Sequence, residues 1–258
     1  MTSLVQQFGE QQVLGFFLVL ARVSPLFVLA PLFSSPLMPP RVRGIVAVGL
    51  AVGMAPIVAR TEIPTELFAI GGLIAKELLV GLAFAFTIGA LFAALSVAGS
   101  FLDTTIGFAF GAVIDPISGN QNAVLAQLYA LIGVLIFIAI NGDAWVIQGL
   151  AGTYELVPVD ELPAIGALTD GALEAFAAIF VAAIQVAGPV MLALILTDAA
   201  FGMVSRVVPQ LNVFAVGFSA KVVVGIGLIG VTLPFVAGWL GNELERSVTD
   251  ALRMLKVA

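Results

Sequence analysis

The chain has 258 residues, of which 61% are apolar and only 10% charged, and its mean hydropathy is +1.16. Soluble domains carry roughly 25% charged residues, so this composition excludes a soluble globular protein. The net charge of −6 argues against the basic surface that nucleic-acid binding requires, and no nucleic-acid partner is expected. Because cysteine and histidine are both lacking, thiol chemistry and the commonest metal ligand are excluded as well.

Several uncharged runs approach or exceed the ~20 residues that a helix needs to cross a bilayer core. They predict an all-α integral membrane protein. The first apolar run covers residues 13–33 and is interrupted by Arg22, Pro25 and Pro31. The paired prolines of SSPLMPPRVR (34–43) predict a turn, because proline cannot continue a helix from within.

A short apolar helix is expected over residues 44–59, followed by a loop. The next apolar pattern covers residues 67–102 and is interrupted only by the adjacent pair Lys76 and Glu77. As one helix it would be about 54 Å long at ~1.5 Å per residue, whereas the hydrocarbon core is about 30 Å thick. This helix must therefore tilt, break or protrude from the bilayer.

Residues 103–122 are predicted to form a connection rich in glycine and aromatic residues, and a further apolar helix is expected over residues 123–140. Residues 143–174 contain six acidic and no basic residues, which predicts a loop on the extracytoplasmic side. Two long helices are then expected over residues 172–207 and 213–245. They read as a hairpin distinct from the first 170 residues.

A short amphipathic tail is predicted after the second of these helices. It carries three basic residues, Arg246, Arg253 and Lys256. In a scheme of six membrane crossings this tail would lie outside the cell, against the usual excess of basic residues on the cytoplasmic side. The conflict indicates that not every apolar helix crosses the membrane.

The predicted helices contain six ionisable residues: Arg22, Lys76, Glu77, Asp103, Asp198 and Lys221. Such residues are costly within a membrane and are often functional. Most of them are expected near helix ends, where long side chains reach the interface, so interfacial or subunit-pairing roles are favoured over a proton or ion pathway. As sequence neighbours, Lys76 and Glu77 are expected to point in different directions. No triad, metal or paired-carboxylate pattern is present, so neither enzymatic activity nor a cofactor is expected.

The segment Gly225-Ile-Gly227-Leu-Ile-Gly230 has the glycine spacing of dinucleotide sites. That motif requires a preceding strand and a βαβ unit, but here it lies within a charge-free helix. Small residues let membrane helices approach closely, so close packing is the favoured interpretation.

The segment Gly107-Phe-Ala-Phe-Gly111 places two glycines around two aromatic residues, and Asp115-Pro116 then forces a turn. Irregular backbone at membrane depth is tolerated only when it is buried in protein or lines a water-filled cavity. The segment is therefore either an ordinary surface loop or an apolar plug within a channel.

The segment PQLNVFAVGFSAK (209–221) separates the two long closing helices. Pro209 removes a backbone donor, and the amides of Gln210 and Asn212 can bond the carbonyls that are freed at the break. A plain hairpin turn accounts for the break but does not require this particular sequence.

Six segments, in register along nearly the whole chain, resemble the FliR family of flagellar export-gate proteins and their injectisome counterparts. The signature turn is Val208-Pro-Gln-Leu-Asn-Val-Phe-Ala-Val-Gly-Phe218. The others are Leu20-Ala-Arg-Val with Ala30-Pro-Leu-Phe, Pro40-Arg-Val-Arg-Gly44, Glu77-Leu-Leu-Val-Gly-Leu82, Phe110-Gly-Ala-Val-Ile-Asp-Pro116 with Ser118, and Asn141-Gly142. The chain departs from the family pattern at Thr104-Thr105, at Asp143 and at Ser219, where the family often has Gln-Met, His and Pro.

The resemblance implies an all-helical, non-enzymatic subunit of a helical, conical pore in the bacterial inner membrane, at the flagellar basal body. Such a pore passes unfolded flagellar proteins across the membrane. Residues 1–171 are then similar to FliP, with the central loop at about 103–122, and residues 172–258 to the hairpin of FliQ, with the amphipathic tail. The implied partners are FliP-like and FliQ-like gate subunits, an FlhB-like switch protein, an FlhA-like export protein, unfolded protein substrates and membrane lipid.

The resemblance also implies two sets of site residues. It favours the plug interpretation for Ile106 to Ser118, and the plug residues are Ile106, Gly107, Phe108, Phe110, Gly111, Asp115 and Pro116. The tip of the closing hairpin is expected to contact neighbouring subunits through Pro209, Gln210, Asn212, Phe214, Gly217, Phe218 and Lys221. Two alternatives stay open: an injectisome subunit, and a small-molecule secondary transporter, whose fold usually shows internal repeats that this sequence lacks.

Overall fold

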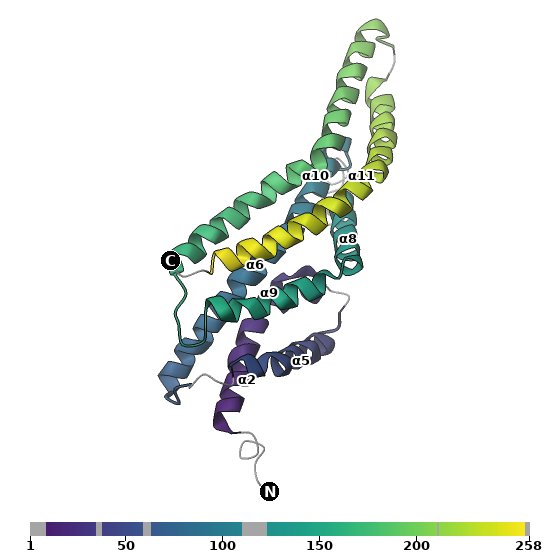
Figure 1. The fold of residues 1–258 in the computed structure, drawn as a ribbon. Helices are drawn as coiled ribbons and strands as arrows, with labels where there is room; N and C mark the ends of the chain where they lie inside the picture. Colours follow the sequence, from purple (N-terminus) through teal and green to yellow (C-terminus); the bar gives the residue numbers. More distant parts are fainter. Residues whose placement is uncertain (1–8, 35–37, 59–62, 110–122, 211, 256–258) are drawn as a thin grey trace. The chain divides into compact units, whose positions relative to one another are not determined.

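A computed structural model describes residues 9–34, 38–58, 63–109, 123–210 and 212–255. Over these ranges the chain is helical, with no strand (Figure 1). The helices are α2 (Glu10–Val23), α3 (Leu26–Leu29), α4 (Pro31–Ser34), α5 (Pro40–Val58), α6 (Leu67–Ile106), α8 (Val124–Ala139), α9 (Gly142–Leu156), α10 (Ile165–Val207) and α11 (Val213–Arg253).

Among the described residues, five helices are long and apolar enough to cross a membrane, or six if α8 and α9 together form one broken span. The five are Gln11–Leu29, Pro40–Val58, Leu67–Ile106, Ile165–Val207 and Ala215–Arg253. The prediction of an all-α integral membrane protein is confirmed.

Helix α6 runs for 40 residues from Leu67 to Ile106. At ~1.5 Å per residue it is about 60 Å long, twice the thickness of a hydrocarbon core. Of the three ways to accommodate such a length, a break is not observed, which leaves tilt or protrusion. Internal prolines occur instead at Pro56 of α5, Pro189 of α10 and Pro234 of α11, where each removes one backbone donor.

The prediction of a loop over residues 143–174 is wrong. Helix α9 covers Gly142–Leu156, and α10 begins at Ile165. One side of α9 is apolar and buried, through Val146, Leu150 and Tyr154, while its acidic residues lie on the exposed side. A helix needs only one apolar face to pack, so a high count of acidic residues does not by itself indicate a loop.

The predicted short tail after residue 245 is also wrong, because α11 continues without interruption to Arg253. Its last turns bury Leu244, Val248 and Ala251, which recur at the spacing of one helix face. The amphipathic pattern was real, but it belongs to the end of a long helix.

The described helices belong to two compact units, each discontinuous in sequence. Unit 1 comprises Met1–Ala90, Asn141–Phe176 and Leu244–Ala258, and unit 2 comprises Leu91–Ile140 and Ala177–Glu243. The predicted boundary at residues 171/172 falls inside α10. The two units reflect which residues contact one another, whereas the predicted boundary concerns similarity to FliP and FliQ. That similarity stays a prediction.

Unit 1 is held together by a close approach between α2 and α6. A Cβ added at Gly81 would collide with the backbone carbonyl of Arg22, so only glycine fits at this position. A cluster of buried side chains from several helices lies nearby in the same unit: Val80, Val157, Leu168, Met254 and Leu255. The end of α11 is thereby packed into the unit that contains the start of the chain.

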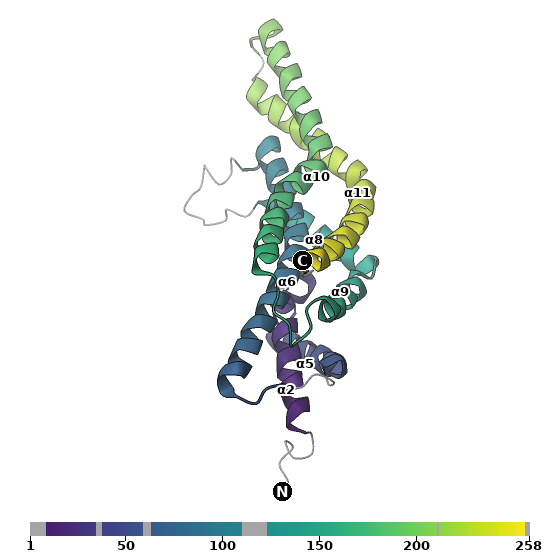
Figure 2. The same cartoon turned by 60° about the vertical axis from the view of Figure 1, so that its left-hand side comes forward.

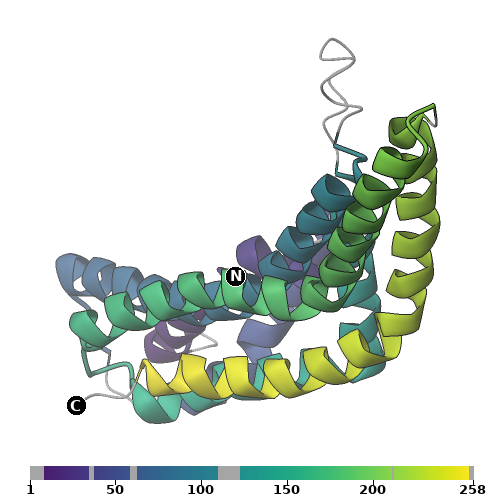
Figure 3. The same ribbon diagram turned by 90° about the horizontal axis from the view of Figure 1, so that it is seen from above.

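Unit 2 uses glycine in a similar way. A Cβ at Gly99 of α6 would lie 2.5 Å from the backbone of Leu125 and Ala126, so α6 and the start of α8 are in backbone contact. In this unit the parts of α10 and α11 next to their shared turn run side by side as a hairpin in each view (Figures 1, 2 and 3). Close helix packing through small residues is usual in membrane proteins.

Candidate functional site

Described residues from both predicted sets, the plug and the hairpin, meet in unit 2. Phe218, Lys221 and Gly225 stand at positions i, i+3 and i+7 of α11 and therefore share one face of the helix. This face contacts the C-terminal end of α6 and the two residues that follow it. We call these three residues of α11 and Thr105–Phe108 the α6 docking site.

Two apolar contacts form the body of the α6 docking site. Ile106 is fully buried, and a Cβ at Gly225 would lie 2.5 Å from its Cδ1 atom. The rings of Phe108 and Phe218 meet edge to face, with centroids 6.4 Å apart. At Gly225 the packing interpretation of the glycine motif is confirmed, whereas Gly227 and Gly230 have no atom within 4 Å of a Cβ position.

The polar contact of the α6 docking site is made by Lys221. Its Nζ donates to the backbone carbonyl of Thr105 at 3.0 Å and pairs with the Asp198 carboxylate of α10, 3.1 Å from Oδ1. The carbonyls of a helix's last turn lack intrahelical donors, and a lysine supplies one. Gly107 follows in the left-handed region, with φ of 107°, and ends the helix.

Asp103 joins the end of α6 to the start of α8 across the intervening connection. Its carboxylate is buried and accepts from the backbone N–H of Leu125 at 3.1 and 3.0 Å and from that of Ala126 at 3.2 Å. These donors belong to the first turn of α8, which has no side-chain cap of its own. An acidic group is favoured there by the helix dipole as well.

At the tip of the hairpin, Asn212 accepts from the backbone N–H of Ala215 at 3.2 Å and caps α11. Pro209 and Gln210 are exposed. Gly217 is buried, but its Cβ position meets only the side chain of Phe201, at 3.7 Å, so no backbone of this chain approaches it. The side chain of Phe214 is not among those described.

The remaining predicted plug residues lie outside the described ranges. They are Phe110, Gly111, Asp115 and Pro116. The α6 docking site therefore contains the described start of the predicted plug, Ile106 to Phe108.

Sequence reasoning missed a buried charge cluster in unit 1, formed by Arg22, Lys76 and Glu77. The guanidinium of Arg22 donates to both oxygens of the Glu77 carboxylate, from Nε at 2.5 Å and from Nη2 at 3.0 Å. Lys76 Nζ lies 2.9 Å from Glu77 Oε1. One carboxylate thus serves two cations, and all three side chains are at most 4% exposed.

The linker between α9 and α10 supplies the other acceptors of this cluster. Lys76 Nζ donates to the carbonyls of Pro158 at 2.8 Å and Val159 at 2.7 Å, and Arg22 Nη2 donates to that of Val157 at 2.8 Å. The Arg22 guanidinium also lies 3.8 Å from the centre of the Tyr154 ring. The cluster therefore fixes the linker against α2 and α6.

The expected interfacial role of these charges is corrected by this geometry. Arg22, Lys76, Glu77 and Asp103 are buried within the chain, and Lys76 and Glu77 contact each other in spite of being neighbours on a helix. A flexible lysine stem can reach back to an adjacent carboxylate when a third group draws both inward. The sequence could have indicated this pairing, because Arg22 and Glu77 both lie in apolar helices, where an unpaired charge is very unfavourable.

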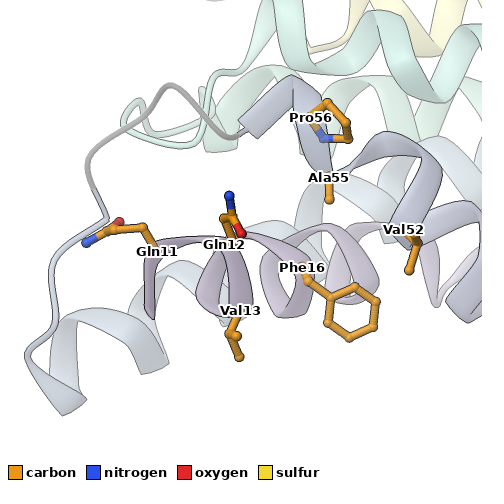
Figure 4. Close-up of a pocket in the computed structure, with 8 residues that line it drawn as sticks. Gln11, Gln12, Val13, Phe16, Val52, Ala55 and Pro56 are labelled. Atoms are coloured by element: carbon orange, nitrogen blue, oxygen red, sulfur yellow. The ribbon is translucent and has the colours of Figure 1, made fainter. Parts of the chain in front are cut away.

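A pocket of about 530 Å³ lies between α2 and α5 in unit 1. Figure 4 shows lining side chains that come from both helices, among them Gln12, Phe16 and Val52. The described residues that line the pocket carry no charged side chain. No group of three acidic residues that could hold a metal ion occurs in the described part of the chain.

Comparison with known proteins identifies a family to which the chain is similar. Residues 13–247 match the family described as bacterial export proteins, family 1. The flagellar biosynthetic protein FliR of Escherichia coli (strain K12) is 30% identical over 243 residues, 93% of each chain. That of Bacillus subtilis (strain 168) is 32% identical over 251 residues, 93% of this chain and 94% of its own.

A relative with lower identity carries a different name. The surface presentation of antigens protein SpaR of Shigella flexneri is 26% identical over 212 residues, 82% of each chain. The resemblance inferred from the six sequence segments is confirmed. With the family match over residues 13–247 and relatives at 30% identity or more over nearly the full length, the chain belongs to the bacterial export proteins, family 1.

Proposed function

We propose that this chain is a structural, pore-forming subunit of the flagellar type III protein export gate, which passes unfolded flagellar proteins across the inner membrane. The observation that carries the proposal is the nearly full-length similarity to FliR proteins, at 30% and 32% identity. The injectisome relative is less similar, at 26% over 82% of the chain, so the flagellar system is preferred.

The geometry supports a passive role in the pore. Asp103 and the α6 docking site fix the two helix ends that flank residues 107–123. We propose that the segment beginning at Ile106, Gly107 and Phe108 closes the pore as an apolar plug, with Phe110, Gly111, Asp115 and Pro116 completing it. Apolar constrictions block ions because water is unstable within them.

The proposed partners are FliP-like and FliQ-like gate subunits, with FlhB-like and FlhA-like proteins at the basal body. Exposed apolar side chains on the hairpin support subunit contacts, since Val207 is 81% and Val223 73% exposed. Lipid covers whichever of these surfaces partners do not. The hairpin tip, with Pro209, Gln210 and Phe218, is proposed as one contact point for a neighbouring subunit.

Native mass spectrometry of the tagged chain, purified in mild detergent from its own cells, tests the proposal. The expected result is a large complex that contains several FliP-like and FliQ-like chains. Recovery as a monomer or simple homodimer would contradict the proposed role. The Val223→Ser variant, at a 73% exposed position on the hairpin, should give a lower yield of the complex, whereas Leu162→Ser, at a 78% exposed position in the α9–α10 linker, serves as a matched control.

A further inference from the structure

In unit 2, Lys221 makes a polar contact between the α10–α11 hairpin and α6. It lies on α11, its carboxylate partner Asp198 lies on α10, and its carbonyl partner Thr105 lies on α6. One ammonium group thus joins three helices. Its side chain is 18% exposed, so most of its stem is packed against protein.

The carbonyl that Lys221 binds lies at the C-terminal end of α6, where backbone carbonyls lack donors from their own helix. Thr105 is the second-last residue of α6, whose final carbonyls carry the negative end of the helix dipole. Gly107 and Ala109 both direct their N–H groups to the carbonyl of Asp103, which leaves that of Thr105 for another donor. A lysine charge there is favoured by the dipole and also supplies the missing hydrogen bond.

The contacts on either side of Lys221 fix the direction of the chain as it leaves α6. Ile106 fills the space above Gly225, and the Phe108 ring meets that of Phe218. These apolar contacts set the distance between α6 and α11 but allow sliding, because packing between apolar side chains is not directional. The Lys221 hydrogen bond is directional and therefore selects one position of α6.

We infer that Lys221 is a positioning residue that clamps the C-terminal end of α6 to the hairpin, with Asp198 holding the ammonium in place. The position of the hairpin then sets the positions of Gly107 and Phe108, which follow α6. The clamp itself is a property of this chain, whereas its consequence for a closed pore rests on the proposed function.

A distance measurement between two spin labels tests the clamp directly. The sequence contains no cysteine, so labels can be attached uniquely after Thr104→Cys and Ser219→Cys, at two exposed positions on either side of the contact. The protein is studied as the intact gate complex in detergent. With Lys221 present, one narrow distance distribution is expected. In the Lys221→Met variant, which keeps the length but loses the charge, we expect the population at that distance to fall by at least half.

Two matched variants separate positioning from simple loss of charge. Lys221→Arg retains a donor at the same place and should restore the narrow distribution. Asp198→Asn removes the counter-charge but keeps an oxygen that can accept from the ammonium, so it should broaden the distribution less than Lys221→Met does. A distribution in Lys221→Met as narrow as in the parent would overturn the inference.

A second label pair within the hairpin distinguishes loss of the clamp from distortion of the hairpin itself. Met203→Cys and Val216→Cys are exposed positions on α10 and α11, and their distance should not change in Lys221→Met. If both pairs broaden, Lys221 maintains the hairpin itself and the clamp is refuted. Ion leakage through the reconstituted complex is then a separate measurement: if the label distance changes but no leak appears, the clamp stands and the proposed plug fails.

Discussion

The Arg22 cluster of unit 1 and the Lys221–Asp198 pair of unit 2 differ in how far water reaches their charged side chains. In the Arg22 cluster of unit 1, the side chains of Arg22 and Glu77 are 0% exposed and that of Lys76 is 4% exposed. In unit 2, the side chain of Lys221 from the α6 docking site is 18% exposed and that of its partner Asp198 is 54% exposed. Both groups bind backbone carbonyls as well as a carboxylate, so the difference lies in solvation and not in chemistry.

This difference separates a permanent support from an adjustable contact. A buried charge that loses its partner has no water to replace it, and the penalty is large. A partly exposed pair loses little, because water and counter-ions screen both members. The Arg22 cluster therefore fixes the linker between α9 and α10 against α2 and α6, whereas the Lys221 contact can form and break at small cost.

The largest effect is expected from Glu77→Gln. The change leaves Arg22 and Lys76 buried side by side without their only buried carboxylate, and breaking such a pair costs about 3–5 kcal/mol of the free energy of unfolding. Thermal unfolding in detergent measures it through Trp145, which lies in unit 1, in a Trp239→Phe background. The Lys76→Met variant is the control: it leaves the Arg22–Glu77 pair intact and should lose less. Equal losses in the two variants would show that leaving two cations without a carboxylate is no worse than removing Lys76 alone.

The next effect is expected from Gly81→Ala. A methyl group there would meet the backbone carbonyl of Arg22, which cannot move as a side chain can, so α2 and α6 must separate at a cost of about 1–3 kcal/mol. Gly72→Ala is a matched control on the same helix, since no atom lies within 4 Å of its Cβ position. Alanine favours a helix over glycine by up to about 1 kcal/mol, so this control should be neutral or stabilising. Destabilisation of similar size in both variants would rule out the close approach as the cause.

A smaller effect is expected from Asp103→Ala in unit 2. The change removes the acceptor for two N–H groups of α8, and loss of a helix N-cap costs about 0.5–2 kcal/mol. Asp103→Asn keeps one acceptor oxygen and should retain part of the stability. Unfolding is followed through Trp239, which lies in unit 2, in a Trp145→Phe background. If Asp103→Asn loses as much as Asp103→Ala, the negative charge matters more than the hydrogen bonds.

Hydrophobic periodicity and proline positions predicted most of the helices, because the residues within and next to a helix largely determine where it begins and ends. The breaks at Pro25 and Pro31 and the end of α8 before Asn141 all follow from residues that stand at those places. Asn141 adopts φ of 55°, a left-handed conformation that asparagine tolerates better than most residues. Helix α9 was not predicted, because a count of acidic residues does not show that those of α9 all lie on its exposed face.

The charged contacts could not be predicted in the same way. Arg22 and Glu77 are 55 residues apart, and Lys221 and Thr105 are 116 apart. Such pairings depend on which helices lie together, and local pattern carries no information on that. The sequence resemblance did include Arg22 and Glu77 in its motifs and implied Lys221 as a residue of the hairpin tip, but it did not indicate these contacts.

The smallest effect is expected from Asp198→Asn, which tests the exposed side of the comparison. Because the carboxylate is 54% exposed, solvent screening limits the ion pair with Lys221 to about 1 kcal/mol or less. High salt should reduce the stability of the parent slightly, towards that of the variant, while the effect of Glu77→Gln should be almost independent of salt because its pairs are buried. Thermal unfolding at low and high ionic strength measures both points, through Trp239 for Asp198→Asn and through Trp145 for Glu77→Gln. A loss in Asp198→Asn as large as that in Glu77→Gln would mean that solvation does not separate the two groups, and that the ion pair between α10 and α11 is as permanent as the buried cluster.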